Sequence, residues 1–327
     1  MSDVVLFSGE PKLIRFTKFL FPLLLACQAF ADEPAPSDSD LFQTVSQTDI
    51  TAQARLADVY RREPKLERYK KSFLQKVSVS TGWLSGGSGS RLDSNFVELS
   101  LETAIPLGSF ERIMGVTPVF RTDDINAAPG IDVPGELHQA GVSFYIPHKV
   151  NDRWSAMAIV SPSVRSDFTT SDNALRIFGL ALLTWQAKPD KLAVSFGAVY
   201  PDRADLPILP AIGLKWTPNP QTIYDIRFPE SRFSWRLAKD SYRSETWMYL
   251  SGGLGGNTWA VTRADGTHDE LSLKDLRLLF GLEHLLDGGG RLFAESGLAF
   301  HRTLEYEATE FEQSFGNAVI IQAGLSY

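Results

Sequence analysis

Residues 316–327 read GNAVIIQAGLSY, and this stretch decides the fold. Every second position is apolar, and the positions between are smaller or more polar; the apolar set is Val319, Ile321, Ala323, Leu325 and Tyr327. A period of two is the pattern of a β-strand whose faces meet different surroundings. The stretch therefore predicts a strand with one strongly apolar face.

The segment before it repeats this pattern on both sides of a glycine-rich turn, residues 287–290. The apolar positions are Leu276, Leu278, Phe280 and Leu282 before the turn, and Leu292, Ala294, Leu298 and Phe300 after it. Most of the charged residues here fall on the alternate face. Strands with lipid on one side and water on the other show this alternation. The sequence predicts an outer-membrane β-barrel.

The same unit of about ten alternating residues and a turn recurs from Ser72 to Tyr327. We expect an all-β fold, a closed antiparallel transmembrane β-barrel of about 14 strands, or 12 if the short ninth and tenth strands are not spans. The expected strands are 72–84, 95–105, 110–120, 137–146, 154–164, 175–186, 192–200, 208–217, 222–228, 231–237, 245–263, 271–284, 291–304 and 316–327.

Composition excludes several classes of protein. The formal net charge of −7, which becomes −8 without the first 31 residues, argues against nucleic-acid binding. Mean hydropathy is −0.10, and the chain has no run of about 18 apolar residues that a membrane helix needs. A barrel accommodates these values because half of each strand faces water.

The N-terminal part predicts export and a tether. Residues 1–31 resemble a signal peptide, with basic Lys12, Arg15 and Lys18, an apolar core, and a small-x-small cleavage site ending at Ala31. The alternative is a lipoprotein, in which Cys27, the single cysteine, is lipidated. Residues 32–71 predict a periplasmic linker that is disordered or forms a short helix. Its basic run, residues 55–71, is a solvated tether or a contact for anionic lipid headgroups or a cell-wall polymer.

Loop lengths and aromatic residues support the barrel. Alternate connections are short, such as 106–109 and 218–221, or ten residues and more, such as 121–136 and 305–315. Bacterial outer-membrane barrels have short turns on the periplasmic rim and long loops outside, so both termini should be periplasmic. Aromatic residues near strand ends fit an interfacial girdle, or the general enrichment of aromatics in strands; they are Trp83, Phe110, Trp154, Trp185, Tyr200, Trp216, Tyr306 and Tyr327.

The C-terminal third resembles an uncharacterised family of bacterial outer-membrane β-barrels, a domain-of-unknown-function family. The residues that carry the resemblance are Gly252–Trp259 (GGLGGNTW), the strand Asp275–Glu283, and Ala323–Tyr327. The family implies the location and the fold, and it supplies no catalytic residues. Barrels of this kind tend to end on an aromatic residue that the barrel-assembly machinery recognises, which makes Tyr327 the expected assembly signal.

Alternation places charged side chains of both signs on the inner face. The predicted lumen-lining residues are Glu98, Glu102, Arg176, Lys215, Asp225, Arg227, Arg236, Asp275, Arg277, Glu283, Arg291, Glu295 and His301. They would line a porin-like passive channel for small polar solutes, or form ion pairs that fill a closed barrel. About 8 strands leave room only for side chains, while 16 to 18 leave an aqueous channel. Fourteen strands lie between these limits.

The residues indicate no enzyme, no metal and no cofactor. Five scattered histidines match no metal-binding spacing. Glu295 and His301 are the nearest approach to an inward acid–base pair, and Asp123, Asp124, Asn126 and Asp132 match no calcium loop. Beside the channel, a structural or adhesive barrel that uses its long loops is the alternative, and a barrel hydrolase is the third hypothesis. The expected partners are outer-membrane lipid, the barrel-assembly machinery and small polar solutes.

Overall fold

The computed structural model describes residues 66–70, 72–87, 91–108, 112–202, 208–309 and 311–327. The predicted signal peptide and almost all of the predicted linker lie outside these residues, as does Phe110. Within them, no helix is long and apolar enough to cross a membrane.

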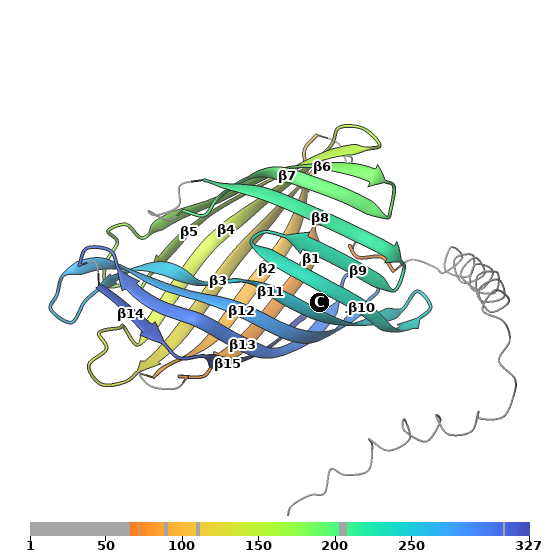
Figure 1. Ribbon diagram of the computed structural model, residues 1–327. Helices are drawn as coiled ribbons and strands as arrows, with labels where there is room; N and C mark the ends of the chain where they lie inside the picture. Colours follow the sequence, from red (N-terminus) through yellow and green to blue (C-terminus); the bar gives the residue numbers. More distant parts are fainter. Residues whose placement is uncertain (1–65, 71, 88–90, 109–111, 203–207, 310) are drawn as a thin grey trace, which may run out of the picture. The chain divides into compact units, whose positions relative to one another are not determined.

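The strands form one sheet (Figure 1). In chain order they are β1 (Leu74–Leu84), β2 (Leu92–Pro106), β3 (Ile113–Ala127), β4 (Glu136–Lys149), β5 (Trp154–Ser166), β6 (Leu175–Lys188), β7 (Leu192–Tyr200), β8 (Leu209–Asn219), β9 (Thr222–Arg227), β10 (Glu230–Asp240), β11 (Ser244–Thr262), β12 (His268–Leu286), β13 (Arg291–Tyr306), β14 (Phe311–Phe315) and β15 (Ala318–Ser326).

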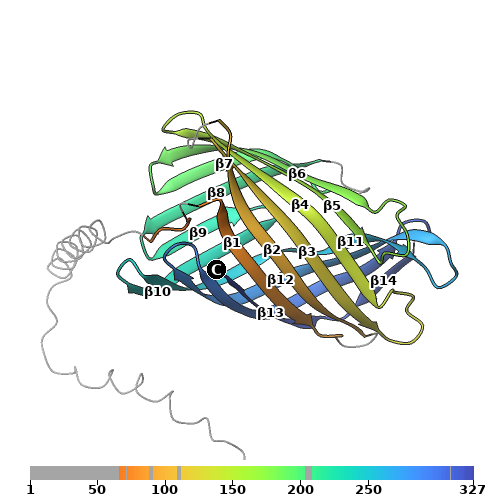
Figure 2. The ribbon, with the colours of Figure 1, turned by 180° about the vertical axis from the view of Figure 1, so that it is seen from behind.

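The sheet closes on itself, because β1 pairs with both β2 and β15. The last two strands occupy one position in the wall: β14 and β15 both pair with β13 and are separated only by Gly316 and Asn317. The barrel therefore has 14 wall positions, which confirms the predicted fold and strand count. Both β9 and β10, which were expected to be short, belong to the wall, since β9 pairs with β8 and with β10. Only β9 is short, with 6 residues against 11 in β10. In Figures 1 and 2, β6 to β8 lie opposite β13 and β15.

The outer face of the wall is a broad apolar surface. On β2, Val97 and Leu99 are 52% and 47% exposed, and on β12, Leu278 and Phe280 are 47% and 50% exposed. The alternate side chains of the same strands, among them Glu98 and Arg277, lie on the inner face. Exposed apolar area of this extent marks contact with membrane lipid. The chain is an outer-membrane β-barrel.

At the end of the barrel that carries the longer loops, this polarity is reversed. Leu271 and Leu304 point inward and are fully buried, while their neighbours Ser272 and Glu305 lie on the opposite face. The inward side chains of this end form one apolar core, composed of Leu92, Ile125, Leu137, Trp259, Val261, Leu271, Leu304, Tyr306 and Phe315. An apolar inside with a polar outside is the pattern of a water-soluble domain, so this end lies beyond the lipid.

Backbone irregularities mark the level at which the polarity changes. Gly256 of β11 has a φ of 89°, and His301 of β13 has a φ of 48°. The β12–β13 register shifts between Lys274 and Leu276, opposite His301. Such a bulge adds one residue to a strand and moves the following side chains to the other face. Because of the bulge, the apolar side chains of β13 point outward where the strand crosses the lipid and inward where it continues beyond the lipid.

The reversal explains two differences from the expected boundaries. The connection expected at residues 305–315 is mostly strand, because β13 continues to Tyr306 and β14 begins at Phe311. The predicted strand ended at Leu304 because the outward side chains beyond it, such as Glu305 and Glu312, are charged and not apolar. For the same reason Tyr306, expected in the interfacial girdle, is only 2% exposed and lies in the core.

Candidate functional site

The inner face of the barrel carries ion pairs directly below the apolar core. Arg121 of β3 contacts Asp123 at 2.7 Å and Glu98 of β2 at 3.5 Å. On β12, the Arg277 Nε lies 2.6 Å from Asp275. The predicted lumen residues Glu98, Asp275 and Arg277 therefore lie in contacts of opposite charge. Arg121 joins them because β3 continues to Ala127, into the loop expected at residues 121–136.

A second group of charges spans β10 to β13. Glu283 forms ion pairs with Arg232 at 2.6 Å and with Arg291 at 2.9 Å. Glu295, further along β13, is hydrogen-bonded by the Tyr249 hydroxyl and the Gln322 amide. Charged groups in a confined interior must be paired in this way.

The third group lies near the short-turn end. Glu245 is surrounded by Arg68 at 3.1 Å, Lys239 at 3.2 Å and Arg236 at 3.5 Å. Arg68 belongs to the basic run that precedes β1, so at least this residue contacts the barrel. Glu102 lies 3.3 Å from Lys76 of β1.

Of the remaining predicted lumen residues, some form ion pairs, one is exposed on the inner face, and one does not face the lumen. Arg176 of β6 pairs with Glu270 of β12, a strand that is not its neighbour in the sheet. Arg227 contacts Asp225 at 2.6 Å, and Lys215 is exposed on the same face of β8 as Ala211. His301 does not follow the expected alternation: it is exposed at the bulge, and its ring contacts Phe300.

Arg302 occupies the interior position that alternation assigned to its neighbour. It is 4% exposed, and its guanidinium donates to the carbonyl oxygens of Leu92, Ser85, Gly86 and Gly316. It thereby holds the β1–β2 loop to the break between β14 and β15. Sequence alternation missed Arg302 because the bulge shifts the register by one residue.

Three cavities lie along the inner wall and share lining residues. One of about 240 Å³ lies under the apolar core, against Arg121, Asp275 and Arg302. A second of about 340 Å³ shares Leu254 and Arg277 with the first. A third of about 400 Å³ shares Glu230 and Arg232 with the second. The lumen is therefore a chain of adjoining spaces.

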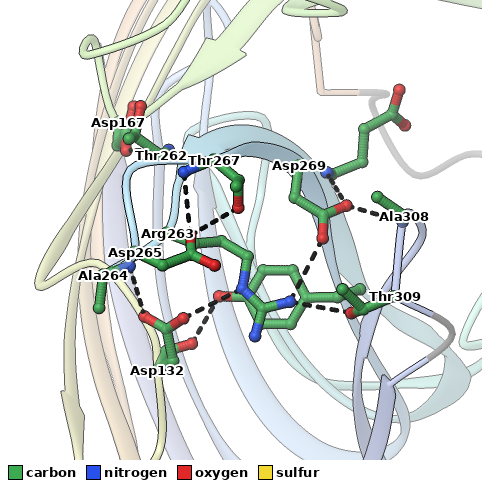
Figure 3. Close-up of polar contacts among 12 residues, drawn as sticks. Asp132, Asp167, Thr262, Arg263, Ala264, Asp265, Thr267, Asp269, Ala308 and Thr309 are labelled. Atoms are coloured by element: carbon green, nitrogen blue, oxygen red, sulfur yellow. Dashed lines mark hydrogen bonds and ion pairs between the residues drawn. The ribbon is translucent and has the colours of Figure 1, made fainter.

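The long-loop end is closed by a polar cluster above the core, which we term the latch: Asp132, Arg263, Asp269, Tyr306 and Thr309. Figure 3 labels Asp132, Arg263, Asp269 and Thr309. Arg263 contacts Asp132 at 3.0 Å, Thr309 at 2.8 Å and Asp269 at 3.5 Å, and its guanidinium lies 4.1 Å from the centre of the Tyr306 ring. The hydrogen bond with Asp132 raises the pKa of Arg263. One side chain thus links the β3–β4, β11–β12 and β13–β14 connections.

A seam between β5 and β11 completes the closure. These strands are distant in the sheet, yet Ser166 and Ala260 form a parallel bridge. The Arg165 guanidinium donates to Asn257 at 3.1 Å, and the Thr262 amide donates to Asp167 at 2.9 Å. The end of β5 therefore crosses to β11 above β6 to β10 and narrows the barrel.

A comparison with known families identifies the relatives of this chain. Residues 126–327 match the family described as Domain of unknown function (DUF6268). The chain belongs to this family. The match includes strands β4 to β15 and the whole latch, so these elements lie in the part that defines the DUF6268 domain.

Solved structures similar to this DUF6268 protein include an autotransporter β-domain and variants of a porin. The β-domain of the Bordetella autotransporter Brka aligns with a TM-score of 0.37 and 11% identity, covering 78% of this chain and 99% of that one. A variant of the Rh. blastica porin aligns with a TM-score of 0.27 and 8% identity over the same shares. No curated protein matches the chain.

The DUF6268 barrel does not assemble the candidate catalytic or calcium groups. Glu295 and His301 are six positions apart on β13, about 20 Å along a strand, and Glu295 has other partners. Asp123 pairs with Arg121, whereas Asp132 pairs with Arg263. Among the described residues, no group of three or more His, Cys, Asp and Glu side chains is arranged to hold a metal ion.

The seam of the DUF6268 barrel should weaken in acid. Burial opposes ionisation of Asp167, but hydrogen bonds from Thr262 and Thr169 outweigh it and lower the pKa of Asp167 below its ordinary 3.8. A lowered carboxyl pKa stabilises the fold above the ordinary value, and this stabilisation is lost as pH falls through the folded-state pKa. We expect hydrogen exchange of residues 257–262, corrected for intrinsic rates, to lose protection below about pH 4.

The Asp167→Asn variant serves as the comparison for this experiment. It should show reduced protection of the same residues at neutral pH and little further change in acid. An equal loss of protection in both proteins on acidification would assign the effect to other groups.

Proposed function

We propose that this protein is a porin-like passive channel for small polar solutes in the outer membrane of a Gram-negative-type envelope. The observation that carries the proposal is the chain of three cavities along a wall of paired charges. A lumen lined by both signs favours passage of polar solutes without strong selection by charge. The residues named for a hydrolase and for a calcium site do not come together in the barrel.

The proposed orientation of the barrel in the membrane is based on the lengths of its loops. Short turns such as the β8–β9 and β12–β13 connections would face the periplasm, together with both termini, and the latch would face outward. Tyr327, 78% exposed after β15, is in this scheme the residue offered to the barrel-assembly machinery. The closed latch implies that conduction occurs in brief openings.

Planar-bilayer recording of the purified, refolded protein tests the proposal. Heat-modifiability on a gel first establishes that the barrel is folded. We expect infrequent, short conductance steps that carry both small cations and small anions. A folded protein that gives no steps, either as the wild type or with the latch weakened as described in the Discussion, would contradict the channel.

A structural barrel without transport is the second candidate function. The apolar core at the long-loop end favours it, because Leu137, Leu271 and Leu304 are fully buried and close the interior. In that case, weakening the latch would lower stability and would produce no conductance. The two functions therefore differ in one measurable outcome.

A further inference from the structure

One part of the inner wall is apolar, although a channel for polar solutes does not require it. Leu182, Val199 and Ala211, on β6, β7 and β8, are 9%, 3% and 2% exposed. They pack with further inward side chains into a surface that we term the apolar wall: Met157, Phe178, Leu180, Leu182, Val199, Leu209 and Ala211. Paired charges line the facing strands β10 to β13.

The apolar wall borders a cavity that also contains charged groups. The cavity of about 400 Å³ is lined on one side by Phe178, Leu180, Leu182 and Val199. On the other side lie Asp225, Arg227, Glu230 and Arg232, from the β9–β10 hairpin. The Arg227 side chain is 48% exposed, while its partner Asp225 is 16% exposed. An apolar surface facing an accessible guanidinium fits a molecule with a tail and an anionic head.

The barrel wall has a notch beside this cavity. The β9–β10 hairpin ends early, since the last pair between β10 and β11 joins Glu230 to Gly253. Strand β11 continues to Thr262, and within the described residues no strand pairs with its Leu254–Trp259 stretch on that edge. Phe228 and Pro229 at the hairpin tip line the cavity. The cavity therefore lies next to a stretch of β11 that, among the described residues, has no paired strand on this edge.

Within this region, Arg227 is the cation that an anion can reach. Its partner Asp225 also lies opposite Lys215 of β8 in the strand register. The other cations on the inner face of β10 are occupied: Arg232 by Glu283, and Arg236 and Lys239 by Glu245. Guanidinium groups bind carboxylates through two parallel hydrogen bonds. The carboxylate of a bound molecule would replace Asp225 as the partner of Arg227 or share Arg227 with it. It would remain partly hydrated, because Arg227 is half-exposed.

We propose that this cavity binds a single-chain amphiphile with a carboxylate head, with the alkyl tail on the apolar wall and the carboxylate on Arg227. The notch gives the tail a lateral route between the lumen and the surrounding lipid. This inference deepens the proposed function, since it adds a class of solute to the same lumen. Binding can be measured whether or not the barrel conducts, so failure of one proposal is distinguishable from failure of the other.

Displacement of a fluorescent dansyl-labelled undecanoic acid from the full-length protein in lipid nanodiscs tests the site, with empty nanodiscs subtracted. We expect saturable displacement by octanoate, decanoate and dodecanoate. Burial of each methylene should tighten binding roughly fourfold. Dodecanol, which lacks the carboxylate, should bind at least tenfold more weakly than dodecanoate.

Two matched pairs of variants locate the tail and the head. Arg227→Gln should weaken dodecanoate binding at least tenfold and remove the preference over dodecanol, whereas Arg153→Gln, in the exposed β4–β5 turn, should change neither. Leu180→Ser should weaken the binding of octanoate, decanoate and dodecanoate alike, whereas Leu183→Ser, on the opposite face of β6, should leave their binding unchanged. Heat-modifiability verifies that each variant is folded.

Three outcomes would overturn the inference. They are non-saturable displacement equal to that of empty nanodiscs, equal affinity for dodecanol and dodecanoate, and unchanged binding in folded Arg227→Gln and Leu180→Ser proteins. If the protein conducts ions but does not bind dodecanoate, the amphiphile site is wrong and the proposed channel for polar solutes still stands.

Discussion

Replacing Gly256 with alanine should destabilise the barrel more than any other single methyl addition in the GGLGG stretch. Gly256 has a φ of 89°, and a Cβ there would lie 1.9 Å from the Leu273 carbonyl oxygen. A positive φ costs an L-residue about 1–2 kcal/mol, and overpacking costs about 1–3 kcal/mol more. The Leu273 backbone is held in the β11–β12 ladder, so it cannot retreat without losing strand pairs.

Gly252→Ala is the matched control on the same strand. The nearest heavy atom to a Cβ at Gly252 is 3.6 Å away, an ordinary contact on the lipid-facing side. Urea unfolding in lipid vesicles should show a loss of about 3 kcal/mol or more for Gly256→Ala and almost none for Gly252→Ala. Equal stability of the two variants would show that the bend in β11 adjusts freely.

The bend matters because it precedes the part of β11 that forms the seam. The residues of β11 that follow Gly256 contact Arg165, Ser166 and Asp167 at the end of β5; they are Asn257, Ala260 and Thr262. Hydrogen exchange of residues 257–262 should therefore increase in Gly256→Ala. In Gly252→Ala the same residues should keep their protection.

Removing the Arg263 side chain should increase conductance openings by about 10- to 100-fold. The side chain is 16% exposed and holds Asp132, Asp269 and Thr309 together. Hydrogen bonds to charged groups contribute about 1.5–3 kcal/mol each to stability, and this free energy is lost only from the closed state. The apolar core below should keep closure the predominant state in Arg263→Ala.

Two further variants make the latch experiment specific. Arg263→Lys keeps the charge but loses the planar group that bridges several acceptors, so its opening frequency should be intermediate. Arg153→Ala removes a cation from an exposed turn at the other end and should match the wild type. Unchanged openings in a folded Arg263→Ala protein would mean that the latch does not control the lumen. Absence of openings in all four proteins would favour the structural barrel.

Sequence alternation predicted the lipid-facing strands because their pattern depends on local surroundings only. On β2, β12 and β15, every second residue meets lipid, and this is visible without knowing the neighbours. The same alternation predicted the number of strands, including β9 and β10. Pairs such as Arg121 with Glu98 were not predictable, because partner choice depends on the register between strands.

Alternation failed where the backbone departs from ideal strand geometry. At His301 one extra residue shifts the register, and Arg302 takes the inward position. Beyond the bulge the two faces of β13 exchange places. Simple alternation would put Leu304 and Tyr306 on the lipid-facing side, whereas in the structure they lie in the core. On β12, by contrast, the apolar positions change phase in the sequence itself, from Leu271 and Leu273 to Leu276 and Leu278, so this strand carries a visible signal of the lipid boundary.

The sequence by itself determined that this chain is a closed membrane barrel, because the solvent on each side of a strand selects the side chain at each position. Only the tertiary structure decided that the barrel narrows and is closed at one end. The seam joins Ser166 to Ala260, and the latch joins Asp132 to Arg263, across more than 90 residues in each case. Contacts of that range depend on how the whole wall curves, and no local pattern records them.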